Sequence, residues 1–336
     1  MAFRKALAGA AAAAASAAAA ALLLAQGASA AVITRTAGVV VINTNLAYQN
    51  AAAAGTGMIL SSSGLVLTNN HVIKGATTIK VVVPATHRSY TATVLGYDTG
   101  NDVALLQLQG AKNLKTVTLG NSSKAKTGQS VTAIGNAGGT GVLTSATGRV
   151  TALRQAITAS DEDGSSEQLT GLIQTNAGLQ PGDSGGPLED ATGHVLGMDT
   201  AASSGFVMES QGNEAYAIPI NKAVTIAKQI ESGHSETAHI GATAFLGVSV
   251  EPVDQGGGGG PGALIAETVP GGPADQAGLV AGDVIVSFDG ETVDSPTTLG
   301  ALVLKHLPGD SVAVVYLDQL GDQQTITVTL GSGPPQ

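Results

Sequence analysis

One short stretch of the chain, Gly182-Asp183-Ser184-Gly185-Gly186-Pro187, combines a nucleophilic side chain with unusual backbone freedom. Glycines around a serine let the chain bend tightly and bring backbone N–H groups against a bound carbonyl oxygen. A serine hydroxyl attacks poorly until a neighbouring imidazole takes its proton, and the imidazole needs a carboxylate that fixes its tautomer. Ser184 is therefore a candidate nucleophile if a histidine and an acid can reach it.

The pattern Gly-x-Ser-x-Gly around Ser184 also fits the nucleophile elbow of an α/β-hydrolase, which needs a following helix and the chain order Ser, acid, His. Pro187 and the turn at Asp190–Gly193 argue against such a helix. The histidines after the serine also fit poorly, because they fall beside that turn, in a predicted linker or in the terminal domain: His194, His234, His239 and His306.

A histidine and an aspartate precede Ser184 in the opposite order. His71 closes the stretch Leu67–His71, and Asp102 opens the apolar run Asp102–Leu106. The order His, Asp, Ser is that of chymotrypsin-type proteases. Asp98 is an alternative acid, but Asp102 directly precedes the run that would bury it beside the imidazole.

These three motifs, separated by 31 and 82 residues, resemble those of bacterial HtrA/Deg-type serine proteases, a trypsin-like domain followed by a PDZ domain. The resemblance covers nearly all of the chain, from about Val39 to Leu330. It implies a mainly β fold, with two six-stranded antiparallel β-barrels of chymotrypsin type and a small C-terminal α+β PDZ domain. It also implies catalysis by His71, Asp102 and Ser184, with the backbone N–H groups of Gly182 and Ser184 forming the oxyanion hole.

The same resemblance suggests a substrate pocket. In the trypsin-like family the residue six positions before the nucleophile lies at the base of the primary specificity pocket, and here that residue is Gly178. Because glycine offers no acid to a basic side chain, cleavage after small or medium aliphatic residues is expected. Thr200, Ala201 and Ala202 are implied as the strand edge that pairs with the substrate backbone. The alternative is a pocket that stays hidden until a loop movement activates the enzyme.

The terminal part of the chain carries a different kind of site. Phe245-Leu246-Gly247-Val248 resembles the carboxylate-binding loop of PDZ domains, in which glycine lets backbone N–H groups converge on a peptide C-terminus. Leu299, Leu302 and Val303 would line the apolar groove beside it.

Short runs rich in Val, Ile, Leu and Thr, separated by Gly, Asn, Ser and Asp, extend from Val39 to Ile218 and must position these residues. Their spacing predicts antiparallel β-sheet in barrels or sandwiches. After Ile220 the period changes and predicts one helix of about three turns that ends near Gly233. The terminal domain is predicted to hold four strands and one helix: strands over Ala263–Thr268, Asp283–Phe288, Ser311–Leu317 and Gln324–Leu330, and a helix over Thr297–Lys305.

The beginning of the chain is predicted to be a signal peptide, because Arg4 and Lys5 precede an Ala-rich apolar stretch that ends in Ala28-Ser29-Ala30. An uncleaved membrane anchor over Ala6–Ala25 is the alternative, but alanine is only weakly apolar. The protein is therefore expected outside the cytoplasm, secreted or in the cell envelope. The predicted organisation is a signal peptide at 1–30, a trypsin-like domain at 31–231, a polar linker at 232–244 and a PDZ domain at 245–331.

The amino-acid composition limits the expected fold, binding partners and catalytic chemistry. Only 12% of the residues are charged and glycine accounts for 46 of 336, against usual shares of about 25% and about 7%, which favours strands and turns. The chain has 15 basic and 25 acidic residues and a net charge of -10. With no basic cluster, nucleic acid is not an expected partner. The absence of cysteine excludes a disulfide scaffold and thiolate catalysis.

Together these features predict an exported serine endopeptidase that acts on unfolded or damaged proteins and exposed peptide segments, with no cofactor or metal. Its PDZ domain would bind peptide C-termini, and because members of the family often form trimers, a homotrimer is a candidate assembly. The alternative is a latent protease that acts mainly as a chaperone or peptide-binding module.

Overall fold

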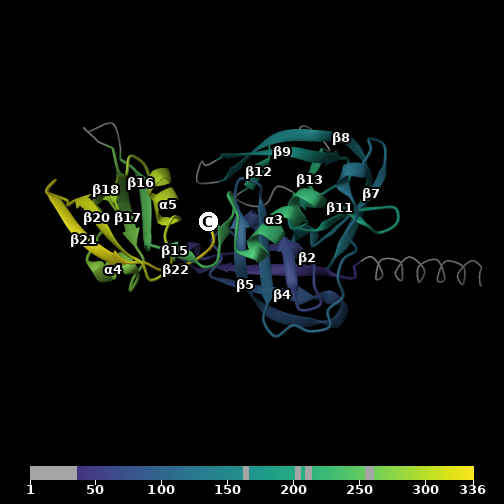
Figure 1. Ribbon diagram of the computed structural model, residues 1–336, viewed down its shortest axis with the longest axis horizontal. Coiled ribbons are helices and arrows are strands. Elements are labelled where there is room, and N and C mark those ends of the chain that lie inside the picture. Colours follow the sequence, from purple (N-terminus) through teal and green to yellow (C-terminus); the bar gives the residue numbers. More distant parts are fainter. Residues whose placement is uncertain (1–35, 162–165, 201–205, 209–213, 254–260) are drawn as a thin grey trace, which may run out of the picture.

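The computed structural model describes residues 36–161, 166–200, 206–208, 214–253 and 261–336. The predicted signal peptide, residues 1–30, lies outside these ranges. Figure 1 shows two strand-rich bodies close together and a smaller terminal domain beside them. None of the helices in the described ranges is long and apolar enough to cross a membrane.

The first body is a closed antiparallel barrel, because its sheet runs in the order β5-β4-β1-β2-β3-β6 and β5 also pairs with β6. Buried side chains such as Val40, Ile42 and Leu106 fill its interior. The short helix α2 (Asn70–Ile73) follows β3. The strands are β1 (Val39–Leu46), β2 (Ala51–Ile59), β3 (Leu65–Thr68), β4 (Thr78–Val83), β5 (Arg88–Asp98) and β6 (Val103–Leu108).

The second body closes in the same way, since its strands run in the order β8-β7-β10-β11-β13-β9 and β8 pairs with β9. The prediction of two six-stranded antiparallel barrels is confirmed. A further strand, β12 (Phe206–Met208), adds to β8. The six barrel strands are β7 (Ser130–Gly135), β8 (Thr144–Asp161), β9 (Ser166–Thr175), β10 (Pro187–Asp190), β11 (Val195–Thr200) and β13 (Ala215–Pro219).

The predicted helix is present as α3 (Ile220–Ser232), 13 residues long, and it packs against both barrels. Its buried Ile226 belongs to a core that also holds Leu105 of the first barrel and Met198 of the second. Replacing such a buried isoleucine by alanine costs about 2–5 kcal/mol. Gly233 ends the helix in the left-handed conformation, with φ of 74°. The junction of the barrels is therefore a packed apolar interface.

The described residues of the two barrels also form four short 3-10 helices: η1 (Ala47–Gln49), η2 (Pro84–Thr86), η3 (Ser122–Lys124) and η4 (Ala137–Gly139).

The terminal domain is a sheet in the order β16-β17-β18-β20-β21, covered by α5. Its predicted strands and helix are all present. A second helix, α4, was not predicted, although Pro273 at its first turn and Gly278 after it are typical helix boundaries. Its elements are β16 (Val248–Pro252), β17 (Ala263–Thr268), α4 (Pro273–Ala277), β18 (Val284–Phe288), β19 (Glu291–Thr292), α5 (Pro296–Val303), β20 (Ser311–Leu317) and β21 (Gln323–Thr329).

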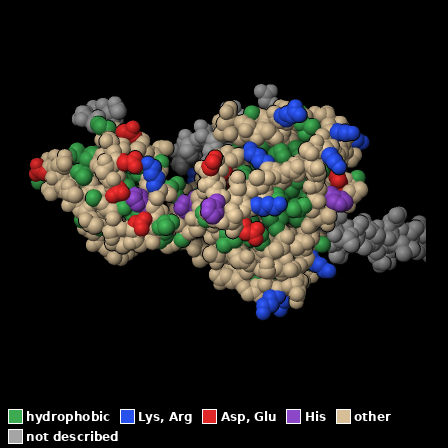
Figure 2. All heavy atoms as spheres, in the orientation of Figure 1, with side chains coloured by type: hydrophobic (Ala, Val, Ile, Leu, Met, Phe, Trp, Pro, Cys, Tyr) green, Lys and Arg blue, Asp and Glu red, His purple; other side chains and the backbone are tan. Residues whose placement is uncertain are grey.

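Short strands lie between the barrels and the terminal domain, in and around the predicted polar linker (Figure 1). In the linker, β14 (His239–Ile240) extends the first barrel by pairing with β5. After it, β15 (Thr243–Phe245) pairs with β22 (Gly331–Gly333) near the end of the sequence. Charged side chains are sparse on the face drawn in Figure 2, where Lys and Arg are scattered among uncharged surface.

Candidate active site

His71 and Asp102 meet in the first barrel. His71 is the second residue of α2, directly after β3, and Asp102 lies in the turn between β5 and β6. The imidazole Nδ1 lies 3.0 Å from Asp102 Oδ1 and 2.9 Å from Oδ2, and the His71 backbone N–H donates to Oδ1 at 3.0 Å. Their side chains are only 5% and 1% exposed. The carboxylate thus holds the proton on Nδ1, which leaves Nε2 as the basic ring nitrogen.

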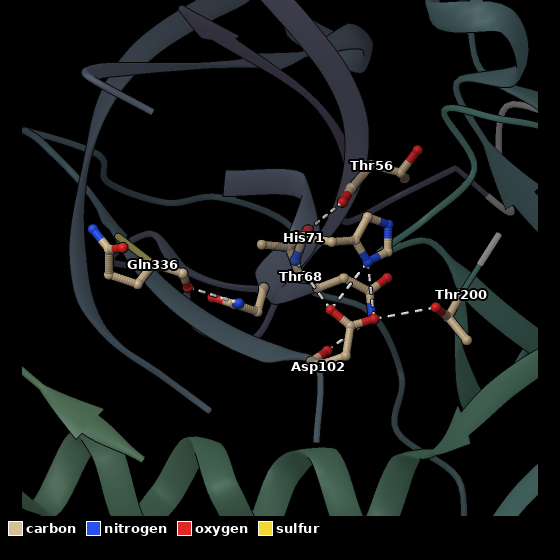
Figure 3. A network of polar contacts seen from close by, with 8 residues as sticks. Thr56, Thr68, His71, Asp102, Thr200 and Gln336 are labelled. Carbon is tan, nitrogen blue, oxygen red and sulfur yellow. Dashed lines mark hydrogen bonds and ion pairs between the residues drawn. The ribbon is translucent and has the colours of Figure 1, made fainter. Parts of the chain in front are cut away.

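Asp102 is itself held both at its carboxylate and at its backbone (Figure 3). Thr200 Oγ1 donates to Asp102 Oδ2 at 3.1 Å, and Asn69 Nδ2 donates to the Asp102 backbone carbonyl at 2.9 Å. Asp102 has a φ of 52°, a left-handed conformation that is unfavourable for a residue with a side chain. These hydrogen bonds offset that cost and fix the direction of the carboxyl group.

Asp98, the alternative acid, points elsewhere. Its Oδ1 accepts from the Asn101 backbone N–H at 3.0 Å, and its Oδ2 accepts from Thr237 Oγ1 at 2.6 Å. It therefore closes the β5–β6 turn and fastens the segment after α3. Asp102 is the carboxylate that lies against His71.

Ser184 lies in the turn before β10 and is 1% exposed. The backbone N–H of Thr56 donates to the Ser184 carbonyl at 2.8 Å, so the turn of the second barrel rests on β2 of the first. A Cβ on Gly185 would lie 2.1 Å from the Thr56 carbonyl oxygen and 2.3 Å from Thr68 Oγ1, and Gly185 has a φ of 84°. Only glycine fits there, which brings the serine turn against the strand that leads to His71.

Gly182, the other proposed oxyanion residue, is similarly confined. Its φ is 99°, and a Cβ would lie 2.2 Å from the Asn136 carbonyl oxygen. The Pro181 carbonyl accepts from the Gly138 N–H at 2.8 Å. The peptide bond between Pro181 and Gly182 is trans, so the Gly182 N–H points opposite to the Pro181 carbonyl and away from Gly138. The Gly182 N–H donates to no backbone carbonyl recorded among the described residues.

Of the expected substrate residues, Gly178 and Thr200 lie within the described ranges. Gly178 is exposed, and a Cβ added there would meet no heavy atom within 4 Å. Thr200 is fully buried at the end of β11, where it pairs with Tyr216 of β13 and supports Asp102 through its hydroxyl. Ala201 and Ala202 lie outside the described residues.

Three buried carboxyl groups lie in the serine turn and in the two strands that follow it: Asp183 in the turn, Glu189 in β10 and Asp199 in β11. Burial raises the pKa of Asp199 well above its ordinary value, and the charges of Asp183 and Glu189 raise it further. Burial also raises the pKa of Asp183, against a hydrogen bond of 2.9 Å from the Gln180 N–H. Among the described residues, no group of three or more His, Cys, Asp or Glu side chains is arranged to hold a metal ion.

Asp199 is bound to the serine turn through its backbone. Its N–H donates to the Gly186 carbonyl and its carbonyl accepts from the Gly185 N–H, both at 2.8 Å. Neither of its carboxyl oxygens has a hydrogen-bond partner among the described residues. Asp199 was not predicted from the sequence, although an aspartate directly after the apolar run Val195–Met198 is a signal that could have indicated it.

In the terminal domain, Leu246 is buried and Gly247 has a φ of 82°, as a tight loop before β16 requires. Val248 begins β16, an edge strand of its sheet. Phe245 has a further contact, because its ring stacks on Tyr48 of the first barrel with centroids 5.3 Å apart. The three groove residues are buried in the core of this domain: Leu299, Leu302 and Val303.

Comparison with known proteins adds independent findings. Residues 55–198 match the model of the trypsin-like peptidase domain, and residues 244–330 match that of the PDZ domain. A "Probable periplasmic serine endoprotease DegP-like" of Halomonas elongata is 36% identical over 289 residues, which cover 83% of this chain and 56% of the relative. The "Serine protease PepD" of Mycobacterium tuberculosis is 34% identical over 307 residues, which cover 87% and 63%.

Solved structures that resemble this chain are also named HtrA-type proteases. The "HtrA-type protease AlgW with tripeptide" is 31% identical with a TM-score of 0.51, and the match covers 90% of this chain and 97% of that chain. The chain spans 56% and 63% of the length of the two curated relatives above.

Proposed function

Because the chain belongs to the HtrA-type serine proteases, which join a trypsin-like domain to a PDZ domain, we propose that it is a serine endopeptidase acting on unfolded or damaged proteins. The observation that carries the proposal is the buried pair of His71 and Asp102, 2.9 Å apart, at the barrel to which the Ser184 turn is hydrogen-bonded. A buried carboxylate on Nδ1 makes the imidazole a base for a nearby hydroxyl.

In the proposed reaction, His71 Nε2 takes the proton of Ser184 as Oγ attacks the scissile carbonyl carbon. The backbone N–H groups of Gly182 and Ser184 hold the oxyanion of the tetrahedral intermediate. The imidazolium then gives its proton to the leaving amine, and an acyl-enzyme remains. Water, deprotonated by His71, attacks the ester and releases the acid, which regenerates Ser184.

The proposal extends to specificity and assembly. Gly178 leaves no acid at the base of the pocket, so we infer cleavage after small or medium aliphatic residues, with the strand edge beyond Thr200, including Ala201 and Ala202, pairing with the substrate. The PDZ domain binds peptide C-termini at Phe245–Val248, where the open edge of β16 accepts an added strand. A homotrimer is proposed on the family resemblance alone.

We also propose an extracytoplasmic location. It is supported by the predicted signal peptide and by relatives named periplasmic serine endoproteases. A chain that acts only as a chaperone or peptide-binding module is not favoured, since the chain carries His71, Asp102 and Ser184 in the order of the proteases and its relatives are named serine endoproteases.

The direct test incubates the purified chain with a chemically unfolded protein and sequences the fragments by mass spectrometry. Ser184→Ala is the matched control, because it removes one oxygen atom and leaves the turn unchanged. Fragments that appear with the wild type and not with the variant support the proposal. Binding of the unfolded protein without fragments from either chain would favour the chaperone alternative.

A further inference from the structure

Thr56 is a fully buried residue of β2 that uses every polar group it has. Its N–H donates to the Ser184 carbonyl at 2.8 Å, and its carbonyl accepts from Thr68 Oγ1 at 2.7 Å. Its hydroxyl donates to the Gly182 carbonyl at 2.7 Å and accepts from the Asn136 N–H at 2.9 Å. One residue of the first barrel thus contacts both proposed oxyanion residues of the second.

The direction of the hydroxyl bond follows from its partners. A backbone N–H can only donate, so the Asn136 N–H occupies a lone pair of the Thr56 oxygen. The hydroxyl proton is then available to the Gly182 carbonyl, which can only accept. The arrangement satisfies two buried backbone groups with a single side-chain atom.

These bonds determine how Gly182 is turned. The carbonyl before it, on Pro181, is held by the Gly138 N–H, and its own carbonyl is held by Thr56. With both flanking peptide planes anchored, the φ of 99° is fixed, and so is the direction of the Gly182 N–H. Glycine has little preference of its own for that angle, so the hydrogen bonds decide it.

The same residue reaches the histidine side of the site. Thr68 lies at the end of β3, and the hydroxyl that it donates to Thr56 ties that strand to β2 just before α2 and His71. Figure 3 shows Thr56 and Thr68 joined by this bond beside His71 and Asp102. Thr56 therefore links the elements that carry the base, the nucleophile and the proposed oxyanion donors.

We propose that the Thr56 hydroxyl is a positioning group for the oxyanion hole, holding the Gly182 N–H toward the oxyanion that forms when Ser184 attacks. This inference rests on the proposed function, since it assigns a role within that reaction. Thr56 does not touch the substrate. It acts through the peptide that joins Gly182 to Asp183, whose carbonyl would lose this hydrogen bond if the hydroxyl were absent.

The test replaces Thr56 by valine, which keeps the shape of the side chain and removes the hydroxyl. We expect kcat on a peptide substrate to fall about 10- to 100-fold with little change in KM, because the lost contact matters only in the transition state. Thr56→Ser keeps the hydroxyl and should restore kcat to within a few-fold of the wild type.

A second readout separates positioning from loss of stability. A peptide boronic acid forms a tetrahedral adduct with Ser184 that places an oxygen in the oxyanion hole. Thr56→Val should weaken its binding by a factor similar to the loss in kcat, while a non-reacting peptide of the same sequence binds as before. Equal weakening of both ligands would overturn the proposal.

Thr44→Val is the matched control. Thr44 is 3% exposed in the same barrel, and its hydroxyl donates to the Ala53 carbonyl at 3.2 Å, away from the serine turn. Its kcat should stay near the wild-type value, and a loss equal to that of Thr56→Val would show a general effect of removing a buried hydroxyl. If Thr56→Val fails to fold, the comparison of Thr56→Ala with Thr56→Ser, at a temperature where both are folded, decides the question in the same way.

The outcomes also distinguish the two proposals. A wild type as inactive as Ser184→Ala means that the proposed function is wrong. An active wild type with an equally active, folded Thr56→Val means that only the role of Thr56 is wrong.

Discussion

The side-chain amide of Asn70 donates a hydrogen bond of 3.0 Å to the backbone carbonyl of Gln336, 266 positions further along the chain. The neighbouring Gly75 N–H donates to the Pro335 carbonyl at 2.8 Å. The segment after β22 therefore rests on α2, the helix that carries His71, and connects the terminal domain to the proposed active site.

Asn70→Ala should loosen this connection. Loss of a single hydrogen bond to a backbone carbonyl lowers stability by about 1 kcal/mol, and we expect faster amide hydrogen exchange in residues 70–75 with the barrel strands unchanged. Gln336→Ala is the control, because the bond uses the backbone carbonyl and survives that change. Identical exchange in Asn70→Ala and the wild type would show that the contact does not hold α2.

Ser184→Ala should leave the fold intact and lower peptide hydrolysis by roughly 10⁴- to 10⁶-fold, because nucleophile and base act as one unit. His71→Ala should cost about as much, and the double variant little more. Steady-state kinetics of the three variants, with circular dichroism as the folding control, tests this. Losses that multiply in the double variant would contradict a shared mechanism.

Asp199→Asn should change how stability depends on pH. Because burial raises the pKa of Asp199, the folded chain keeps a proton that the unfolded chain releases above the ordinary pKa of 3.8. The contribution of Asp199 to stability is therefore fully present below that value and is lost as pH rises through the folded pKa. In the variant this part of the decline should disappear, as urea unfolding between about pH 4 and about pH 8 will measure.

Asp190→Asn is the control of opposite sign. Burial alone would raise the pKa of Asp190, but hydrogen bonds from Thr192 and His194 lower it overall. That carboxylate stabilises the folded chain above its ordinary pKa, and the contribution is lost as pH falls. An Asp199→Asn profile that parallels the wild type would show that Asp199 does not hold a proton in the folded chain.

Gly178→Asp should move cleavage toward Lys and Arg, because an acid at the base of the pocket pairs with a basic side chain. The added side chain has room, since no heavy atom lies within 4 Å of a Cβ built there. A peptide library read by mass spectrometry compares the two chains. If the wild type already prefers Lys or Arg, the acid of the pocket comes from another residue.

Gly247→Val should weaken binding of peptide C-termini strongly. Gly247 has a φ of 82°, and a Cβ would lie 3.2 Å from Pro273 Cδ, so a branched side chain forces the loop to move. Calorimetry with the full chain carrying Ser184→Ala measures the affinity without cleavage. A peptide with an amidated C-terminus is the control, and affinity equal to that of the free acid would show that the domain does not recognise the carboxylate.

The sequence by itself indicated the antiparallel strands, the α3 helix and the strands and helix of the terminal domain, because each depends on local periodicity and on turn residues. Periodicity left barrels and sandwiches open, and the two barrels were expected only from the family resemblance. It also indicated His71, Asp102 and Ser184, since their order along the chain is characteristic. Gly185 was recognisable for a local reason, because a tight turn beside a serine favours glycine at its own position.

The sequence favoured Asp102 over Asp98, four positions earlier, but only the tertiary structure shows what each carboxylate contacts, because the β5–β6 turn directs Asp102 to His71 and Asp98 to Thr237. The roles of Thr56 and Asp199 were likewise hidden, since a threonine in a strand and an aspartate after an apolar run acquire meaning from partners far away in the chain. Thr56 reaches Gly182 across 126 positions. The periodicity of a sequence indicates which face of a segment is buried in the core. Contacts between residues so far apart in the sequence form only when both barrels have closed and packed together.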